Sequence, residues 1–215
     1  IVVSRVGASH DGGAAEGYAS ASHIRQLLRQ GGGGEALAFL PPGAAEVLLR
    51  ELAAGRIADG ALVERAILAR LRQMTEEEFA AYDGGGEGLY HRVYDAVRRC
   101  ATVEELLAAV KTKRYTAARL RRMVLSAWLG LSKAPETVPY ARVLAANETG
   151  RALLRQMRKA GAPVLTKAAD VAALGSGAEA LFRREAGYTD LYTLAYTDLA
   201  QAVPGSDWRL TPMMK

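Results

Sequence analysis

The sequence predicts a mainly α-helical protein with small α/β parts. Apolar residues recur at helical spacing across most of the segment that follows Pro41, which favours packed helices. A strand–helix–strand pattern follows Pro139. A third small element opens the chain, where residues 1–6 have the composition of a buried strand.

The composition is that of an ordinary soluble globular protein. Of the 215 residues, 50% are hydrophobic and 24% are charged. The net charge of +5 permits nucleic-acid binding without requiring it. The single Cys100 excludes an internal disulfide and a cysteine-based zinc site, and with only three histidines we predict no metal site. No apolar stretch approaches the ~20 residues of a membrane span and no signal peptide is present, so we expect a cytoplasmic protein without membrane contact.

The N-terminal 40 residues predict a phosphate-binding arrangement. The strand at residues 1–6 is followed by a glycine-rich loop at 7–17 and by a helix that begins after small hydroxyl residues at 20–22 and ends at the glycines of 31–34. A strand, a glycine loop and a helix N-terminus can cradle a phosphate. Because the opening strand lacks an initiator Met and a pairing partner, we expect further sequence to precede it.

The middle of the chain, residues 41–134, predicts a helical region. Thr75 with Glu78, and Thr102 with Glu105, have the spacing of capping boxes, and Thr116 can cap the helix after them. The expected helices cover residues 42–51, 60–74, 89–100, 102–110 and 116–131.

Residues 135–215 predict a small α/β region. Strands at 140–146 and 163–167 flank a helix at 150–159, and two further helices are expected at 177–185 and 189–196. The expected domains are therefore 1–40, 41–134 and 135–215.

The most informative segment is a basic run that opens the helix at 116–131. It holds six positive charges, no negative charge and one aromatic residue, Tyr115. The cations lie beside a ring that can stack on a base or pack on a ribose, and this combination favours a folded RNA as ligand. The alternative interpretation is a helix face that is simply exposed to solvent. The cations are Lys111, Lys113, Arg114, Arg119, Arg121 and Arg122.

Candidate phosphate-binding residues lie near the N-terminus. Ser20, Ser22 and Arg25 stand at a helix start, where hydroxyls, backbone N–H groups and a guanidinium can surround a triphosphate, although every capped helix has something similar. Arg5 ends the opening strand, where an α/β sheet places its ligand, or where an arginine forms a surface ion pair. The adjacent pair His10-Asp11 fits a turn better than a catalytic dyad. The sequence contains neither a P-loop nor a nucleophile elbow.

In order, these segments resemble one family, the bacterial tRNA(Met) cytidine acetate ligases. The resemblance spans nearly the whole chain, and it is specific because several strings occur together. They are Arg5-Val6-Gly7-Ala8 with His10-Asp11, Ser20-Ala21-Ser22-His23-Ile24-Arg25, Glu87-Gly88-Leu89 with Arg92, Lys111-Thr112-Lys113-Arg114-Tyr115-Thr116 with Arg119, Tyr140-Ala141-Arg142-Val143-Leu144, and Thr189-Asp190-Leu191-Tyr192 with Ala195-Tyr196.

The resemblance implies an ATP-dependent ligase. Such an enzyme activates acetate as acetyl-adenylate and acetylates the exocyclic amine of the wobble cytidine in elongator tRNA(Met). Its ATP-binding domain is a Rossmann-like nucleotidyltransferase fold with a His-x-Gly-His element. This chain has no such element, so we expect it to be the last part of that domain followed by the helical C-terminal region, inactive by itself and with catalytic residues unknown.

Site residues also follow from the resemblance. Arg5 and Val6 would line the ATP site. Ser20, Ser22 and Arg25 would lie near the β- and γ-phosphates of ATP. A Mg²⁺ ion would bind these phosphates, and the resemblance names no protein ligand for it. The shorter segment before His10 leaves the contacts of that residue open. The tRNA backbone would be held by Lys111, Lys113, Arg114, Arg119 and Arg122, with Tyr115 stacking or packing on it.

Two other functions remain open at this stage. One is a non-catalytic tRNA-binding module that positions tRNA for a separate enzyme. The other is a small-molecule adenylyltransferase with a helical extension. The sequence does not indicate the oligomeric state.

Overall fold

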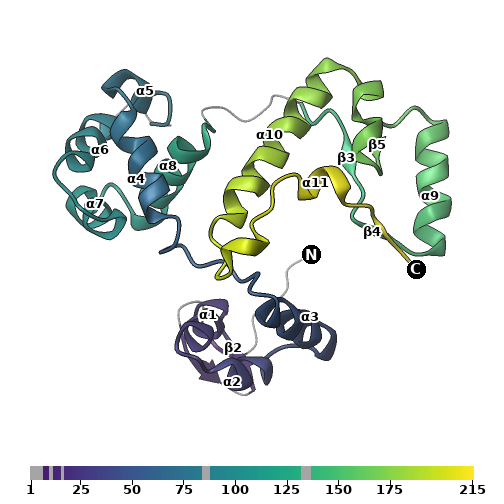
Figure 1. Ribbon diagram of the computed structural model, residues 1–215, viewed down its shortest axis with the longest axis horizontal. Coiled ribbons are helices and arrows are strands. Elements are labelled where there is room, and N and C mark those ends of the chain that lie inside the picture. Colours follow the sequence, from purple (N-terminus) through teal and green to yellow (C-terminus); the bar gives the residue numbers. More distant parts are fainter. Residues whose placement is uncertain (1–6, 10–11, 16, 84–87, 132–136) are drawn as a thin grey trace. The chain divides into compact units, whose positions relative to one another are not determined.

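Helices form most of the structure, a computed structural model that describes residues 7–9, 12–15, 17–83, 88–131 and 137–215 (Figure 1). The prediction of a mainly helical chain with small sheets is confirmed. Two units pack internally, Ile1–Gly55 and Arg56–Lys215. The predicted strand at residues 1–6 lies outside the described residues.

The described part of the first unit holds a short hairpin and three helices. Strands β1 (Ala14–Ala15) and β2 (Tyr18–Ala19) pair antiparallel around Gly17, whose φ of +78° suits glycine. Helix α1 (Ala21–Arg29) ends before Gly31 as predicted. Gly33 and Gly34, however, open α2 (Gly33–Leu37), because a helix N-terminus tolerates glycine better than a helix interior does. Helix α3 spans Pro42–Ala53.

Five helices of the second unit share one apolar core. They are α4 (Glu64–Gln73), α5 (Glu76–Ala80), α6 (Leu89–Val97), α7 (Val103–Val110) and α8 (Ala117–Leu129). Leu71, Phe79, Leu106 and Leu120 are among the residues buried there. Each helix thus places its apolar positions toward the core, as the helical spacing predicts.

Local caps fix where these helices begin. Thr75 and Glu78 form the predicted capping box at α5. At α7 the Thr102 hydroxyl accepts from the Glu105 N–H, whereas the Glu105 carboxylate accepts from Ala101, one residue before the cap. The Thr116 hydroxyl caps α8 by accepting from the Arg119 N–H, as predicted.

The last part of the chain contains the predicted strand–helix–strand unit. Strand β3 (Ala141–Arg142) pairs in parallel with β5 (Val164–Leu165), and α9 (Glu148–Lys159) connects them. The expected strand at 140–146 is divided, because β4 (Ala145–Ala146) pairs instead with β6 (Met213–Met214) at the end of the chain.

A 3₁₀ segment and the helix that follows it form most of a second apolar core, together with Tyr140 and Leu165. After the 3₁₀ segment Ala168–Leu174, α10 runs unbroken over Ser176–Thr193, so the prediction of two separate helices here is wrong. The core that buries Phe182 and Ala186 of α10 outweighs the helix-breaking tendency of Gly187, a cost of about 1 kcal/mol. A 3₁₀ turn (Leu199–Gln201) and α11 (Ser206–Arg209) follow.

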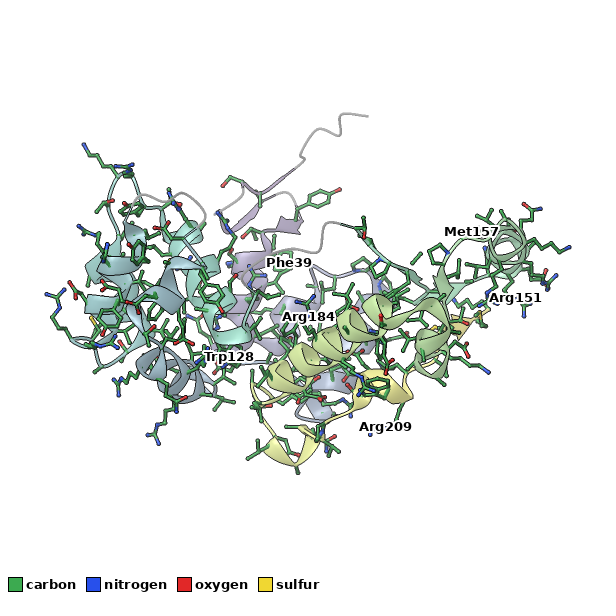
Figure 2. The ribbon with its side chains drawn as sticks, turned by 90° about the horizontal axis from the view of Figure 1, so that it is seen from above. Phe39, Trp128, Arg151, Met157, Arg184 and Arg209 are labelled. Atoms are coloured by element: carbon green, nitrogen blue, oxygen red, sulfur yellow. The ribbon has the colours of Figure 1, made fainter. Side chains whose placement is uncertain are left out.

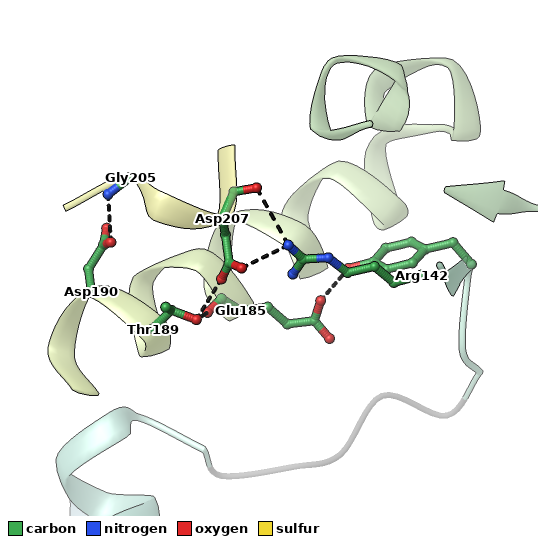
Figure 3. Close-up of polar contacts among 7 residues, drawn as sticks. Arg142, Glu185, Thr189, Asp190, Gly205 and Asp207 are labelled. Carbon is green, nitrogen blue, oxygen red and sulfur yellow. Dashed lines mark hydrogen bonds and ion pairs between the residues drawn. The ribbon is translucent and has the colours of Figure 1, made fainter. Parts of the chain in front are cut away.

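A polar network ties β3, α10 and α11 together (Figure 3). The Arg142 guanidinium contacts the buried Asp207 carboxylate at 2.7 Å, and the Thr189 hydroxyl donates to the same carboxylate at 2.5 Å. The Tyr140 hydroxyl donates to Glu185 at 2.5 Å. Two of the sequence strings quoted above, which are almost fifty residues apart, are therefore joined through Asp207, which Arg142 and Thr189 both contact.

We expect Tyr140 to make stability sensitive to alkaline pH. Burial and the hydrogen bond to Glu185 raise the pKa of Tyr140 well above its usual range. In the unfolded chain this hydroxyl has a pKa of about 10, so its stabilising effect is complete below about pH 10 and is lost above it, at up to ~1.4 kcal/mol per pH unit. Urea unfolding of the unaltered protein and of Tyr140→Phe should differ by a constant amount below about pH 10 and converge above it. A constant difference up to about pH 11 would contradict the assignment.

Candidate nucleic-acid interface

The loop between α7 and α8 is held by the core on both sides. Val110 ends α7 with 1% of its surface exposed, and Tyr115 is 6% exposed within the same core. Between them, the Thr112 N–H donates to the Tyr115 carbonyl, and the Tyr115 N–H donates to the Thr112 hydroxyl at 3.0 Å. This tight turn leaves little freedom to the short segment between its ends.

The loop and the start of α8 present the predicted cations to solvent. Their apolar neighbours Leu120, Met123 and Val124 face the core, so the charged positions between them face outward. The exposed cations are Lys111, Lys113, Arg114, Arg121 and Arg122. A loop fixed at both ends presents these charges to a polyanion at a smaller cost in conformational entropy than a mobile loop would.

The structure corrects the expectation for Tyr115. Its ring packs against the helical core with 6% of the residue exposed, so neither face is open to a base. The guanidinium carbons of Arg114 and Arg119 lie 5.9 and 5.3 Å from the ring centroid. Tyr115 therefore anchors the loop beneath its cations, and the predicted stacking on RNA is wrong for this arrangement.

Arg119 is partly exposed and forms an ion pair with the buried carboxylate of Asp83. Its Nη2 lies 3.3 Å from Oδ1 of Asp83, whose side chain is 1% exposed. Oδ2 of Asp83 accepts from the N–H groups of Leu89 and Tyr90 at the start of α6. Asp83 thus caps α6, and Arg119, whose side chain is 29% exposed, balances its charge.

Sequence reasoning did not identify Asp83. The acid lies 36 residues before Arg119, and no short-range spacing links the two. The only local signal is an acidic residue followed by glycines ahead of a helix, which is also typical of an ordinary turn.

The predicted phosphate-binding residues divide into two kinds at α1. Ser20 is 6% exposed, and its hydroxyl forms hydrogen bonds within the protein. The hydroxyl accepts from the His23 N–H and donates to the Gly12 carbonyl at 2.7 Å. Ser22 is exposed, and the Arg25 guanidinium reaches its hydroxyl at 3.4 Å. Ser22 and Arg25 therefore lie together at a free surface, whereas Ser20 positions the helix start.

A pair of serine variants separates these roles. Ser20→Ala should lower the free energy of unfolding of the first unit by about 1 kcal/mol, because α1 loses its cap. Ser22→Ala, two residues away and exposed, should change it by less than about 0.5 kcal/mol. Equal effects in thermal unfolding followed by circular dichroism would argue against the cap.

Several of the residues discussed from the sequence lie outside the part of the chain that the structure describes. They include Arg5 and Val6, and His10 with its neighbour Asp11. Within the described part of the chain, no three His, Cys, Asp or Glu side chains gather in a group able to hold a metal ion. Among the same residues, no helix is long and apolar enough to cross a membrane.

A capped helix that follows a glycine-rich segment is suited to bind the phosphate of a nucleotide. The family model described as HIGH Nucleotidyl Transferase matches residues 1–205. The chain belongs to this family.

The curated relatives make the resemblance more specific. The tRNA(Met) cytidine acetate ligase of Syntrophomonas wolfei subsp. wolfei is 26% identical over 227 residues, which covers 99% of this chain and 55% of that protein. The ligase of the same name from Thermoanaerobacter sp. (strain X514) is 34% identical over 134 residues, 60% of this chain and 32% of that protein. The resemblance to this group of ligases is confirmed, and the chain spans about half the length of such relatives or less.

Solved structures show the same fold. The apo crystal structure of Thermotoga maritima TmcAL superposes with a TM-score of 0.87 at 24% identity, over 99% of this chain and 54% of that one. A second crystal structure, of T. maritima TmcAL bound with alpha-thio ATP, gives a TM-score of 0.82 at 24% identity, over 92% of this chain and 52% of that one.

Proposed function

We propose that this chain supplies the RNA-binding surface, and part of the nucleotide site, of an ATP-dependent ligase that acetylates the wobble cytidine of elongator tRNA(Met). The observation that carries the proposal is the basic loop between α7 and α8, where exposed cations are held by buried anchors at Val110 and Tyr115. Relatives named tRNA(Met) cytidine acetate ligase support the same assignment.

The proposed reaction has two group transfers. An acetate oxygen attacks the α-phosphorus of ATP, and the bond from that phosphorus to the pyrophosphate oxygen breaks, which yields acetyl-adenylate and pyrophosphate. The exocyclic amine of cytidine then attacks the acetyl carbon, loses a proton and displaces AMP. Both steps move negative charge onto phosphate oxygens, which fixed donors and cations stabilise.

Within this chain, Ser22 and Arg25 are the described residues suited to the β- and γ-phosphates. Both lie at the start of α1, where backbone N–H groups and the helix dipole favour an anion. The Ser20 hydroxyl contributes indirectly, by fixing the first turn through His23 and Gly12. Arg5 and Val6 stay proposals that rest on the resemblance alone.

Mg²⁺ is proposed only as a companion of the ATP phosphates. The described residues offer no group of three metal-binding side chains, so we assign it no protein ligand and derive no step from it. The expected cytoplasmic location also stays a prediction.

The chain alone should not form acetyl-adenylate. The sequence contains no His-x-Gly-His element, the part that the family resemblance assigns to adenylate formation. Acetate-dependent exchange of labelled pyrophosphate into ATP measures this step directly, and exchange catalysed by these 215 residues would overturn this part of the proposal.

The choice of ligand separates the ligase from the adenylyltransferase alternative. A ligase fragment should bind tRNA with strong salt dependence, because the exposed cations displace counterions from phosphates. A small-molecule adenylyltransferase should bind a small nucleotide substrate and be indifferent to tRNA. Fluorescence titrations of the full chain with labelled tRNA and with nicotinamide mononucleotide decide between them.

A further inference from the structure

A second basic surface lies in the C-terminal part of the chain. A groove of about 320 Å³ runs beside α9, and among the described residues that line it four are cations and none is acidic. Arg151, Arg155 and Arg158 come from α9, and Lys167 comes from the segment after β5. Thr211 and Met214, near the end of the chain, line the groove as well.

The three arginines lie on one face of their helix. Their spacing of four and three residues places them on successive turns, so their charges extend over about 10 Å. The Arg158 guanidinium donates to the Thr166 hydroxyl at 2.7 Å, which fixes it toward the segment that carries Lys167. Figure 2 labels Arg151 on this helix, which is seen nearly end-on.

Folding alone gives little reason for this charge. Helix α9 has no buried residue, so its arginines do not cover an apolar core. Arg151 forms an ion pair with Glu148 at 3.9 Å, and this pair is weak because the Glu148 side chain is 91% exposed. Like charges one turn apart destabilise a helix by a few tenths of a kcal/mol per pair, and a bound polyanion removes that cost.

The chemistry of the groove suits phosphodiesters. Guanidinium groups bind phosphate oxygens through paired hydrogen bonds, and a row of about 10 Å exceeds the size of one phosphate. A free phosphate ion would engage only part of the row, whereas a strand with a phosphate every few ångströms can engage all of it.

We infer that the α9 groove, defined by Arg151, Arg155, Arg158 and Lys167, is a second contact for the backbone of the RNA substrate. The inference rests on the proposed function, because it takes the RNA to be the one that the α7–α8 loop binds. It adds a site that combines three arginines of α9 with Lys167, which lies on the other side of β5.

The test compares two matched double variants of the full chain. Arg151→Gln with Arg155→Gln removes two groove charges. Arg184→Gln with Arg209→Gln removes two exposed charges of the same region that do not line the groove. The slope of log affinity for elongator tRNA(Met) against log salt should fall by about 1.4–1.8 in the groove variant and stay unchanged in the control variant.

The outcomes separate this inference from the proposed function. An unchanged slope in the groove variant, with a reduced slope in a loop variant at Lys113 and Arg114, overturns the inference and leaves the proposed function standing. A groove variant that loses affinity for inorganic phosphate but keeps the full RNA slope shows a small-anion site, which also overturns it. If the unaltered protein binds no RNA, both fail. Circular dichroism of each variant checks that the helices are retained.

Discussion

Replacing Lys113 and Arg114 together by alanine should flatten the salt dependence of tRNA binding. Both side chains are exposed on a turn that buried Tyr115 anchors, so their loss should remove phosphate contacts without disturbing the core. Each lost contact lowers the log–log slope by about 0.7–0.9, or about 1.4–1.8 for the pair, with affinity at about 0.1 M salt falling by tenfold or more. Titrations between about 50 and 200 mM salt measure both quantities.

The matched control is the same charge change made elsewhere. Arg184→Ala with Arg209→Ala removes two exposed cations from the C-terminal part of the chain and should leave the slope intact. Equal slopes for the loop variant and the unaltered protein would mean that the cluster is a solvated helix face, the alternative that the sequence left open.

Removing the Asp83 carboxylate should have the largest effect on stability. In Asp83→Ala the N–H groups of Leu89 and Tyr90 lose their acceptor and Arg119 loses its counter-charge, all at a site whose acid side chain is 1% exposed. Breaking a buried charge pair together with a helix cap costs on the order of 3 kcal/mol. Urea denaturation at neutral pH gives the difference.

Two further variants identify the cause. Asp83→Asn keeps an acceptor for the helix N–H groups and should lose less than the alanine variant does. Arg121→Ala, an exposed cation two residues beyond Arg119, should stay within about 0.5 kcal/mol of the unaltered protein. An Asp83→Ala protein as stable as the Arg121→Ala protein would contradict the structural role assigned to this acid.

Elements that depend on local signals were predictable from the sequence. The Thr75 and Thr116 caps and the helix after Pro41 depend on residues within a few positions of each other, and the structure places them where the pattern predicts. The strand–helix–strand unit also follows a local pattern, and the structure pairs its strands β3 and β5 in parallel.

Features that depend on distant segments were not predictable. Helix α10 continues through Gly187 because its neighbours pack into the core beneath it. The helix propensity of glycine takes no account of that packing. Tyr115 precedes the periodic stretch of α8, so helical spacing gave no sign that its ring is buried. The contact of Asp83 with Arg119, and the position of Lys167 beside the arginines of α9, depend on chain folding in the same way.

Competition between two tRNAs tests the central claim most directly. Labelled elongator tRNA(Met) is bound to the full chain at low and moderate salt, and unlabelled elongator or initiator tRNA(Met) is added as competitor. The proposed function predicts salt-sensitive binding that the elongator displaces at a lower concentration than the initiator does. Binding to neither tRNA at low salt would contradict the assignment of RNA recognition to this chain.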